Sequence, residues 1–403
     1  MKRRLLFVIN TLGRGGAETA LLALLRRLDP EEYDVSLYVM LGQGELVSRL
    51  PEHVRLLNRR YDASDVLSRR GKVRLYRRLF ALLLRGGAVR RCLPGAAAAW
   101  KEMRRAGKVR PDKLLWRAIA ESTPPPEEEY DLAVAYLEGA STYYVADRVK
   151  ARRKAAFVHV DLLHAGYTPA LDGKAYEAFG RIFCVSRETR SAFLRLHPEC
   201  EEKTAVFENL LDEEGIRRLA EEPGGFSDGF TGFRILTVGR LVPQKALEYS
   251  IEAMALVKRE EPDTRWYVLG EGEERRSLEA RISALGLEGD FLLPGVTDNP
   301  YPYYRQADLY VHCSRFEGRS IAVREAMLLG CPVLLSDCAG NRDQITDGAD
   351  GILTPLEPEA MGEAILRLIR DPELRKRLGA NAARRDQSGG DLAELLGTEE
   401  VRA

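Results

Sequence analysis

Paired cysteines and long apolar segments are both missing from this chain of 403 residues. Its six cysteines are scattered and none forms a Cys-x-x-Cys pair, which disfavours a zinc site or a redox pair, so we expect reduced thiols. After a basic start, the apolar run at residues 5–9 is too short for a signal peptide. No uncharged stretch approaches the roughly 20 residues that a membrane-spanning helix needs. The sequence therefore predicts a cytoplasmic protein, and it leaves open attachment to the inner face of a cell membrane.

The chain also lacks a net charge, because 61 basic residues balance 61 acidic ones. The balance conceals an asymmetry: residues 1–200 carry 36 basic and 23 acidic side chains, and residues 201–403 carry 25 and 38. With 45% hydrophobic and 30% charged residues, the composition is typical of packed globular domains and excludes a largely disordered chain. We expect two or three domains, with a basic half preceding an acidic one.

Short apolar runs that alternate with helical patterns organise the chain. This alternation predicts an α/β protein with two doubly wound, Rossmann-like domains that face a cleft. Ligands of such domains bind outside the carboxyl ends of the strands, so we expect the site there. The expected strands are residues 5–9, 35–40, 131–136, 155–160 and 182–185 in the first half and 234–239, 265–269, 290–293, 309–312 and 332–335 in the second.

Domain boundaries follow from composition. We expect an N-terminal domain at 1–208, a linker region at 209–232, a second domain at 233–380 and a tail at 381–403. The linker assignment depends on the glycine-rich stretch at 223–232, which cannot hold a regular element.

Residues 59–117 form a basic insertion in the first domain, with 18 Lys or Arg against 4 Asp or Glu. A helix is predicted at 73–85, with apolar side chains on one face and arginines largely opposite. One interpretation is a helix that packs on the core and exposes its basic face to water. The other is a surface for a membrane or an anionic acceptor, because each basic residue near an anionic leaflet contributes about 1 kcal/mol. A nucleic-acid partner is disfavoured because no reading motif occurs. The apolar positions are Val73, Tyr76, Leu79, Phe80, Leu83 and Leu84.

Two glutamates eight residues apart, Glu317 and Glu325, lie in the second half. Glu317 is in the loop after a predicted strand, and Glu325 is about two turns into the following helix. Between them, the loop at 318–322 directs backbone N–H groups toward the helix N-terminus, where an anion such as phosphate is favoured. Carboxylates accept hydrogen bonds from sugar hydroxyls, so the pattern suits a phosphorylated polyhydroxy ligand.

Two cations, Arg240 and Lys245, follow another predicted strand and its glycine turn. An Arg fork and a Lys point charge at one strand end match what a diphosphate leaving group requires. In the first domain, the loop at residues 11–18 also follows a strand and opens a helix, so a phosphate could approach it closely. Its glycines at 13, 15 and 16 depart from Gly-x-Gly-x-x-Gly, which disfavours a nicotinamide cofactor.

Together, these motifs resemble the GT-B glycosyltransferases of family 4, which are retaining enzymes that use nucleotide sugars. The Glu-x7-Glu spacing is a strong signal when GGAE and VGRL accompany it in this order. The resemblance covers most of the chain, with GGAE at 15–18, YDLAVAYLEG at 130–139, FVHVD at 157–161, VGRLVPQK at 238–245, GEGEERRSLE at 270–279 and EAMLLGCPV at 325–333.

The resemblance implies a role for each motif. Arg240 and Lys245 would bind the diphosphate, and Glu325 would hold the nucleotide ribose. Glu317 would lie against the donor sugar hydroxyls, and His159 near the transferred sugar; Asp161 and His164 are weaker candidates. The implied catalytic residues are Glu317, His159, Arg240 and Lys245. The implied donor-binding residues are Gly15, Gly16, Arg240, Lys245, Gly272, Val296, Glu317, Ser320, Ile321, Ala322 and Glu325.

Within this set, the resemblance has Gly15 and Gly16 close over the donor, and Gly272 and Val296 contact the base. The amides of Ser320, Ile321 and Ala322 would lie near phosphate and sugar.

Several positions depart from the family pattern. Ala246 stands where a glycine is usual after the lysine, and Arg319-Ser320 replaces an aromatic-glycine pair, which leaves the donor sugar open. Asp343 stands where a glutamate is frequent. The end of the chain is short and broken by glycines where the family returns a helix to the first domain, so we expect weaker tethering there.

The implied activity is transfer of a sugar from a nucleotide sugar, UDP before GDP, to a hydroxyl of a surface polysaccharide or a lipid-linked saccharide. No Asp-x-Asp occurs, so we expect no metal and no other cofactor. The alternatives are a nucleotide-sugar epimerase of the same architecture, which needs no acceptor, and a non-catalytic module that binds nucleotides or glycans.

Overall fold

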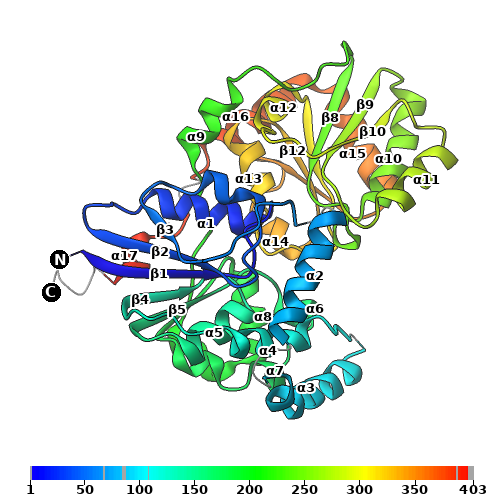
Figure 1. The fold of residues 1–403 in the computed structure, drawn as a ribbon. Coiled ribbons are helices and arrows are strands. Elements are labelled where there is room, and N and C mark those ends of the chain that lie inside the picture. Colours follow the sequence, from blue (N-terminus) through cyan, green and yellow to red (C-terminus); the bar gives the residue numbers. More distant parts are fainter. Residues whose placement is uncertain (1, 67–68, 84–87, 108, 387–388, 398–403) are drawn as a thin grey trace. The chain divides into compact units, whose positions relative to one another are not determined.

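A parallel sheet lies at the centre of the first unit of the computed structural model, which describes residues 2–66, 69–83, 88–107, 109–386 and 389–397. Chain contacts define this unit as Met1–Leu210 with Gly389–Ala403. The strand order is β3-β2-β1-β4-β5-β6-β7 (Figure 1). The strands are β1 (Arg3–Ile9), β2 (Tyr33–Val39), β3 (Val54–Leu56), β4 (Tyr130–Ala135), β5 (Ala151–Val158), β6 (Arg181–Cys184) and β7 (Thr204–Val206).

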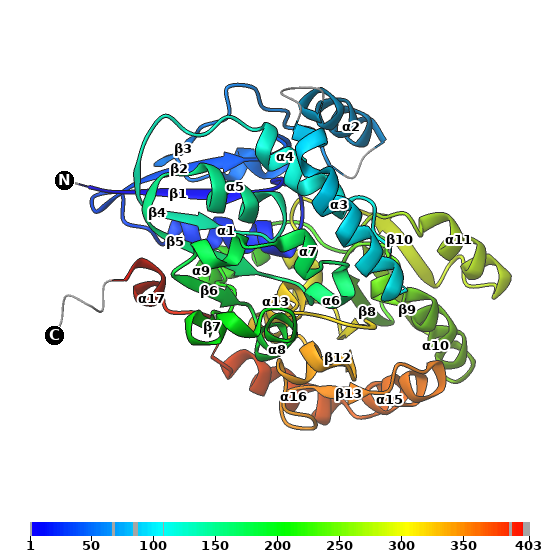
Figure 2. The same ribbon diagram turned by 90° about the horizontal axis from the view of Figure 1, so that it is seen from below.

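Helices cover both faces of this sheet because successive strand residues point in opposite directions (Figure 2). Leu5 and Phe7 of β1 pack in the same core cluster as α1, whereas Leu6 and Val8 pack with α5. The strands are therefore buried on both sides, as their continuous apolar runs require. The helices are α1 (Gly16–Arg26), α2 (Arg69–Leu83), α3 (Ala88–Arg105), α4 (Trp116–Ser122), α5 (Ala140–Arg148), α6 (Leu162–Ala165), α7 (Pro169–Asp172), α8 (Arg187–Leu196) and α17 (Leu392–Leu396).

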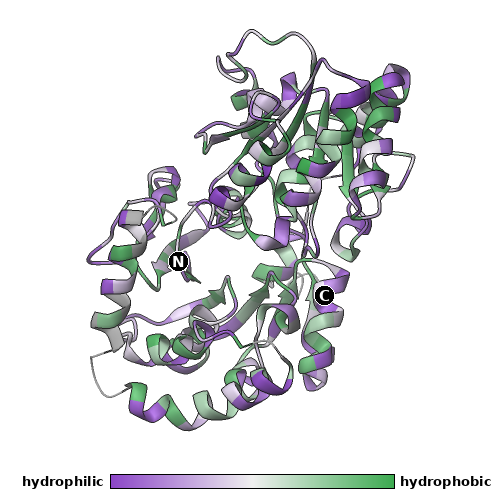
Figure 3. Ribbon diagram, turned by 90° about the vertical axis from the view of Figure 1, so that its right-hand side faces the viewer, coloured by the Kyte–Doolittle hydropathy of each residue, from purple (hydrophilic) through white to green (hydrophobic). Residues whose placement is uncertain are grey.

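The second unit, Leu211–Ser388, is built around another parallel sheet, of order β10-β9-β8-β11-β12-β13. Hydrophobic residues concentrate in its strands (Figure 3). The strands are β8 (Phe233–Val238), β9 (Thr264–Leu269), β10 (Phe291–Gly295), β11 (Leu309–His312), β12 (Val333–Ser336) and β13 (Ile352–Thr354). The helices are α9 (Glu213–Ala220), α10 (Leu247–Glu260), α11 (Arg275–Ala284), α12 (Tyr301–Gln306), α13 (Ile321–Leu328), α14 (Ala339–Arg342), α15 (Pro358–Arg370) and α16 (Pro372–Arg384).

Strand order reverses at equivalent places in the two sheets. β1 pairs with β2 on one side and β4 on the other, and β8 pairs with β9 and β11. Loops that leave such neighbouring strands in opposite directions open a crevice at their carboxyl ends. The predicted α/β class with two Rossmann-like units is confirmed, and every expected strand is present.

The chain divides at Leu210 and Leu211, and the region expected as a linker at 209–232 contains α9. Asp228, in the glycine-rich part of this region, accepts hydrogen bonds from Arg265 at 2.9 Å and from Tyr267 at 2.5 Å. Both donors are on β9, so the glycine-rich part packs on the second unit.

The expected tail at 381–403 also differs from the structure. It begins inside α16, and after that helix α17 returns to the first unit. There Leu395 and Leu396 are buried in the core, so these two apolar residues hold the tail that we expected to be weakly tethered. Residues 387–388 and 398–403 of the tail lie outside the described residues.

The helix predicted at 73–85 is α2, and the part of its predicted apolar face that the structure describes does not pack on the core. Val73, Tyr76 and Phe80 are all exposed. The side chains of Leu79 and Leu83 and all of 84–85 lie outside the described residues. None of the cysteines forms a disulfide. Among the described residues, no helix is both long enough and apolar enough to cross a membrane.

Candidate functional site

Two loops at the carboxyl ends of β8 and β11 are joined by hydrogen bonds in the second unit. After β8 the chain makes a short 3-10 turn, Pro243–Lys245. Gln244 donates from its side chain to the carbonyl of Phe316 at 2.9 Å and accepts from the backbone of Arg315 at 2.9 Å. This join places Lys245 of one loop beside Glu317 of the other.

Three donors converge on one oxygen of Glu317. Lys245 Nζ donates to Glu317 Oε1, His312 Nε2 lies 3.1 Å from the same atom, and Ser314 Oγ donates to it at 2.5 Å. The Glu317 side chain is only 8% exposed. No hydrogen bond to Oε2 is found within the described part of the chain, so this second oxygen is the one available to a ligand hydroxyl.

The charges in this cluster follow from its contacts. Burial alone would raise the pKa of Glu317, but the charge of Lys245 and the hydrogen bond from His312 outweigh burial and hold that pKa well below its usual range. Burial and the nearby Lys245 both lower the pKa of His312. At neutral pH Glu317 is therefore a carboxylate in contact with Lys245, beside a neutral imidazole.

His312 is a functional candidate that the sequence did not reveal. Its Nδ1 lies 3.1 Å from the hydroxyl of Tyr310, and its Nε2 lies near both Lys245 and Glu317. If the Tyr310 hydroxyl donates to Nδ1, the ring proton is on Nε2, and Nε2–H donates a hydrogen bond to Glu317 Oε1. The available signal was a single polar residue that ends the apolar run LYVH.

Arg240 contrasts with Lys245 because it is exposed and makes no hydrogen bond or ion pair with any described residue. A guanidinium without a protein partner at a strand end is free to bind an anion. Nearby, a Cβ on Gly272 would lie 2.0 Å from the carbonyl oxygen of Leu241, so glycine is needed there for close backbone packing. Val296, just after β10, is 41% exposed. Within the described chain, no contact at Gly272 or Val296 defines a site for the nucleotide base.

Glu325 lies on α13 in a pocket of tyrosines. Tyr301 donates to its Oε1 at 3.1 Å and Tyr304 to its Oε2 at 3.2 Å. Burial raises the pKa of Glu325 to about 7, although both hydrogen bonds favour the charged form. The carboxyl group therefore titrates near neutral pH.

The N-terminus of α13 carries the predicted backbone donors. Ser320 is the N-cap and adopts an extended conformation, and Ile321 and Ala322 are the first helical residues. Such N–H groups have no partner within their own helix and favour an anion. The structure thus brings together Lys245 and Glu317 by direct contact, and it places the amides of Ser320, Ile321 and Ala322 three to five residues beyond Glu317.

A second cluster follows β4 and β5 in the first unit. The backbone N–H of His159 donates to Oε2 of the buried Glu138 at 3.1 Å, and Asn10 donates from its side chain to the carbonyl of Glu138 at 2.9 Å. Burial lowers the pKa of His159 to about 3, so its ring is neutral. The buried His159 Nε2 has no hydrogen-bond partner among the described residues. Glu138 and Asn10 were missed by sequence reasoning, although Glu138 ends the strand-loop run AYLEG.

The remaining candidates of the first unit have local roles. Asp161 caps α6 and accepts from His164 Nδ1 at 2.7 Å, so these two weaker candidates pair with each other. Gly15 is the N-cap of α1 and Gly16 its first residue. A Cβ on Gly15 would meet only the carboxylate end of Glu18, which can move.

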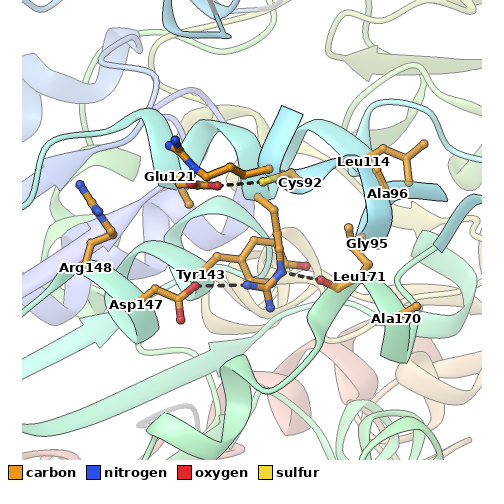
Figure 4. A pocket seen from close by; sticks show the side chains of 13 residues that line it. Cys92, Gly95, Ala96, Leu114, Glu121, Tyr143, Asp147, Arg148, Ala170 and Leu171 are labelled. Atoms are coloured by element: carbon orange, nitrogen blue, oxygen red, sulfur yellow. Dashed lines mark hydrogen bonds and ion pairs between the residues drawn. The ribbon is translucent and has the colours of Figure 1, made fainter. Parts of the chain in front are cut away.

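A cavity of about 420 Å³ lies among α3, α4, α5 and α7 of the first unit and contains none of the predicted site residues (Figure 4). Two of its three lining arginines are already paired, Arg91 with Glu121 and Arg117 with Asp147 at 3.2 Å. The described residues contain no group of three or more His, Cys, Asp or Glu side chains placed to hold a metal ion.

Residues 230–385 match the family model for glycosyl transferases group 1. The second unit is a group 1 glycosyltransferase domain. The matched segment contains both strand-end loops and α13, so Lys245, Glu317 and Glu325 all lie within this domain.

Two curated relatives of the chain are named as sugar transferases. The poly(glycerol-phosphate) alpha-glucosyltransferase of Bacillus subtilis (strain 168) is 31% identical over 152 residues, which are 37% of this chain and 23% of that protein. The N-acetylgalactosamine-N,N'-diacetylbacillosaminyl-diphospho-undecaprenol 4-alpha-N-acetylgalactosaminyltransferase of Campylobacter jejuni is 33% identical over 176 residues, or 43% and 46% of the two chains. The chain thus matches less than half the length of either relative.

Among solved structures, Anabaena Alr3699/HepE in complex with UDP and glucose has a TM-score of 0.69 and 17% identity, with each chain fully covered. This likeness extends the GT-B fold over both units. The group 1 domain is therefore half of a GT-B architecture, and the first unit is the other half.

Proposed function

We propose that the protein is a retaining glycosyltransferase that moves a sugar from a UDP-sugar to a hydroxyl of a surface polysaccharide or a lipid-linked saccharide. The observation that carries this proposal is the contact of Lys245 with Glu317 in a group 1 domain. Arg240, which follows the same strand as Lys245, is exposed. Two cations suit a diphosphate, and a carboxylate with one free oxygen suits the hydroxyls of the attached sugar.

The choice of donor and acceptor is supported by the relatives. HepE forms a complex with UDP and glucose, which favours a UDP-sugar here. The Bacillus relative is named for poly(glycerol-phosphate) and the Campylobacter relative for a diphospho-undecaprenol saccharide, and these favour a surface polymer or a lipid-linked acceptor.

The cluster stabilises the charges that develop in this reaction. The bond between the anomeric carbon and the diphosphate oxygen breaks, while the acceptor oxygen bonds to the same carbon from the same face. The acceptor proton passes to the departing phosphate. In this scheme Arg240, Lys245 and the α13 amides stabilise the negative charge on that phosphate. Such electrostatic stabilisation is usually the largest catalytic contribution.

Glu317 acts in this scheme as a positioning carboxylate. Its Oε1 is held by Lys245, His312 and Ser314, so only Oε2 remains to accept from the sugar. A carboxylate whose pKa lies well below the usual range is a weak nucleophile, and we propose no covalent intermediate on Glu317.

We also propose that the reaction needs no metal ion, because Arg240 and Lys245 can neutralise the diphosphate. Full activity in EDTA is the expected result. Loss of activity in EDTA that only added metal restores would contradict this part of the proposal.

The decisive experiment incubates UDP-sugars and GDP-sugars with and without candidate acceptors and measures released nucleotide and products. A transferase releases nucleotide in proportion to acceptor and yields a product of retained anomeric configuration. Conversion of the donor without acceptor would instead identify an epimerase. Tight nucleotide binding without any product, across acceptors, would identify a binding module.

A further inference from the structure

The apolar stripe of α2 faces away from the core of the first unit. Gly71 is buried and Leu75 packs against a core cluster, so these residues mark the docked side of the helix. With about 100° per residue, Val73, Tyr76 and Phe80 fall within about 60° of one another on the opposite side. Their side chains are 53%, 67% and 65% exposed.

A similar stripe occurs on α3. Val89, Leu93 and Trp100 share one face of that helix and are 37%, 56% and 43% exposed. Two fully buried residues, Ala99 and Met103, lie on the adjoining side of the helix, about 100° and about 60° around from Trp100. Six of the ten large apolar side chains found exposed among the described residues thus lie on α2 and α3; the other four are Val109, Leu285, Val296 and Phe316.

Basic side chains border both stripes. On α2 the exposed arginines 70, 74 and 77 occupy the flank next to the apolar stripe. On α3 the guanidinium of Arg104 lies 4.8 Å from the ring of Trp100, and other exposed basic residues share that edge. Residues 59–117 carry 18 basic against 4 acidic side chains.

We infer that α2 and α3 form an attachment surface for an anionic lipid bilayer, with the two apolar stripes entering the interface and the flanking arginines binding lipid phosphates. Helices that lie in a membrane interface have this combination of an apolar face and a basic flank. A second copy of the chain is disfavoured as occupant, because a symmetric contact would place these basic edges against each other. Such attachment does not depend on the proposed sugar transfer.

The test is flotation of the full chain with vesicles of phosphatidylcholine, with and without phosphatidylglycerol, at low and high salt. Three proteins are compared with the wild type. The first carries Val73→Ser, Tyr76→Ser and Phe80→Ser, the second carries Arg70→Gln and Arg77→Gln, and the control carries Leu285→Ser, an exposed apolar position in the second unit.

We expect the wild type and the control to float only with anionic vesicles and to remain partly bound at high salt. The serine variant should bind at least tenfold more weakly under all conditions, and the glutamine variant should lose binding mainly at low salt. A blue shift of Trp100 fluorescence on binding, absent from Trp100→Phe, would place α3 in the interface.

Absence of wild-type flotation at low salt would overturn the inference. Unchanged flotation of the serine variant would also overturn it. So would a sedimentation experiment in which the serine substitutions convert a dimer to a monomer without any loss of flotation. Circular dichroism checks that the triple variant is folded; if it is not, Phe80→Ser alone must still weaken flotation several-fold.

Discussion

Three buried glutamates, one in the first unit and two in the second, show how their contacts decide the effect of burial on charge. Glu317, in the second unit, touches Lys245 and its pKa lies well below the usual range. Glu138, at the equivalent edge of the first unit, contacts backbone groups, and its burial raises its pKa. Among the described residues, Glu325 accepts side-chain hydrogen bonds only from tyrosines, and its pKa rises to about 7. Burial raises a carboxyl pKa unless a cation lies within hydrogen-bond distance, so of these three glutamates only Glu317 belongs to an ionic cluster.

The largest expected effect comes from removing the charge of Glu317. Glu317→Gln should lower kcat between about 100- and 1,000-fold, because a charged acceptor for the sugar is lost. The affinity for UDP should change little, because the nucleotide does not need this carboxylate. Steady-state kinetics and UDP titration measure both.

Glu279→Gln, an exposed carboxylate of α11 paired with Arg275, is the matched control and should leave kcat unchanged. Equal losses in kcat and UDP affinity for Glu317→Gln would remove the distinction between this glutamate and the nucleotide-binding groups.

Glu325 should give stability a specific dependence on pH. Its pKa is about 7 in the folded protein against 4.5 ordinarily, so the folded state binds the proton more tightly. The resulting stabilisation is complete below about pH 4.5, is lost as the pH rises to about 7, and amounts to roughly 3 kcal/mol.

Glu325→Gln lacks this titration. As the pH rises from about 4.5 to about 7, the free energy of unfolding of the wild type should therefore fall by roughly 3 kcal/mol relative to that of the variant. Denaturant unfolding at several pH values checks this difference. Parallel pH curves for the two proteins would show that Glu325 ionises normally.

A smaller effect is expected in the first unit. His159 is neutral over the working range because its pKa is about 3, so it contributes at most an uncharged hydrogen bond. His159→Gln should lower kcat about fivefold, which corresponds to roughly 1 kcal/mol. The pH profile of kcat between about pH 5 and 8 should keep its shape. An inflection in the wild type that disappears in the variant would make His159 a proton carrier instead.

The smallest effect concerns Ala246, the residue after Lys245. Its φ of 47° lies in the left-handed region, the one such case among the described residues other than glycine. Ala246→Gly should relieve about 1 kcal/mol of strain but lose a buried methyl and add chain entropy, which offset the gain. We expect a change in unfolding free energy below about 1 kcal/mol. A larger gain would mean that the methyl group packs poorly.

Much of the fold could be predicted because its central strands are continuous apolar runs. The strands β3, β7 and β13 were missed since each has three residues and lies at a sheet edge, where a short strand gives no such run. The helix α2 was predicted, but not its docked face, because Gly71 and Leu75 anchor it through tertiary contacts that periodicity does not encode.

The site divides in the same way. Lys245, Glu317 and Glu325 stand in motifs, so their residue types and spacing identified them. His312 and Glu138 are single polar residues at the ends of apolar strands, a pattern that is usually structural. They join the two clusters because β8 is a neighbour of β11 and β4 a neighbour of β5. The local sequence does not encode this strand order.

The most direct test of the central claim is UDP binding to the second-unit cluster, measured as thermal stabilisation in the presence of EDTA. UDP at about 100 times its Kd should stabilise the wild type by roughly 2.7 kcal/mol. Arg240→Ala should require at least about tenfold more UDP for the same stabilisation, whereas the control Arg276→Ala, another exposed arginine of this unit, should match the wild type. If no nucleotide stabilises the wild type, or if Arg240→Ala responds like the control, the cluster does not bind a diphosphate and the account fails.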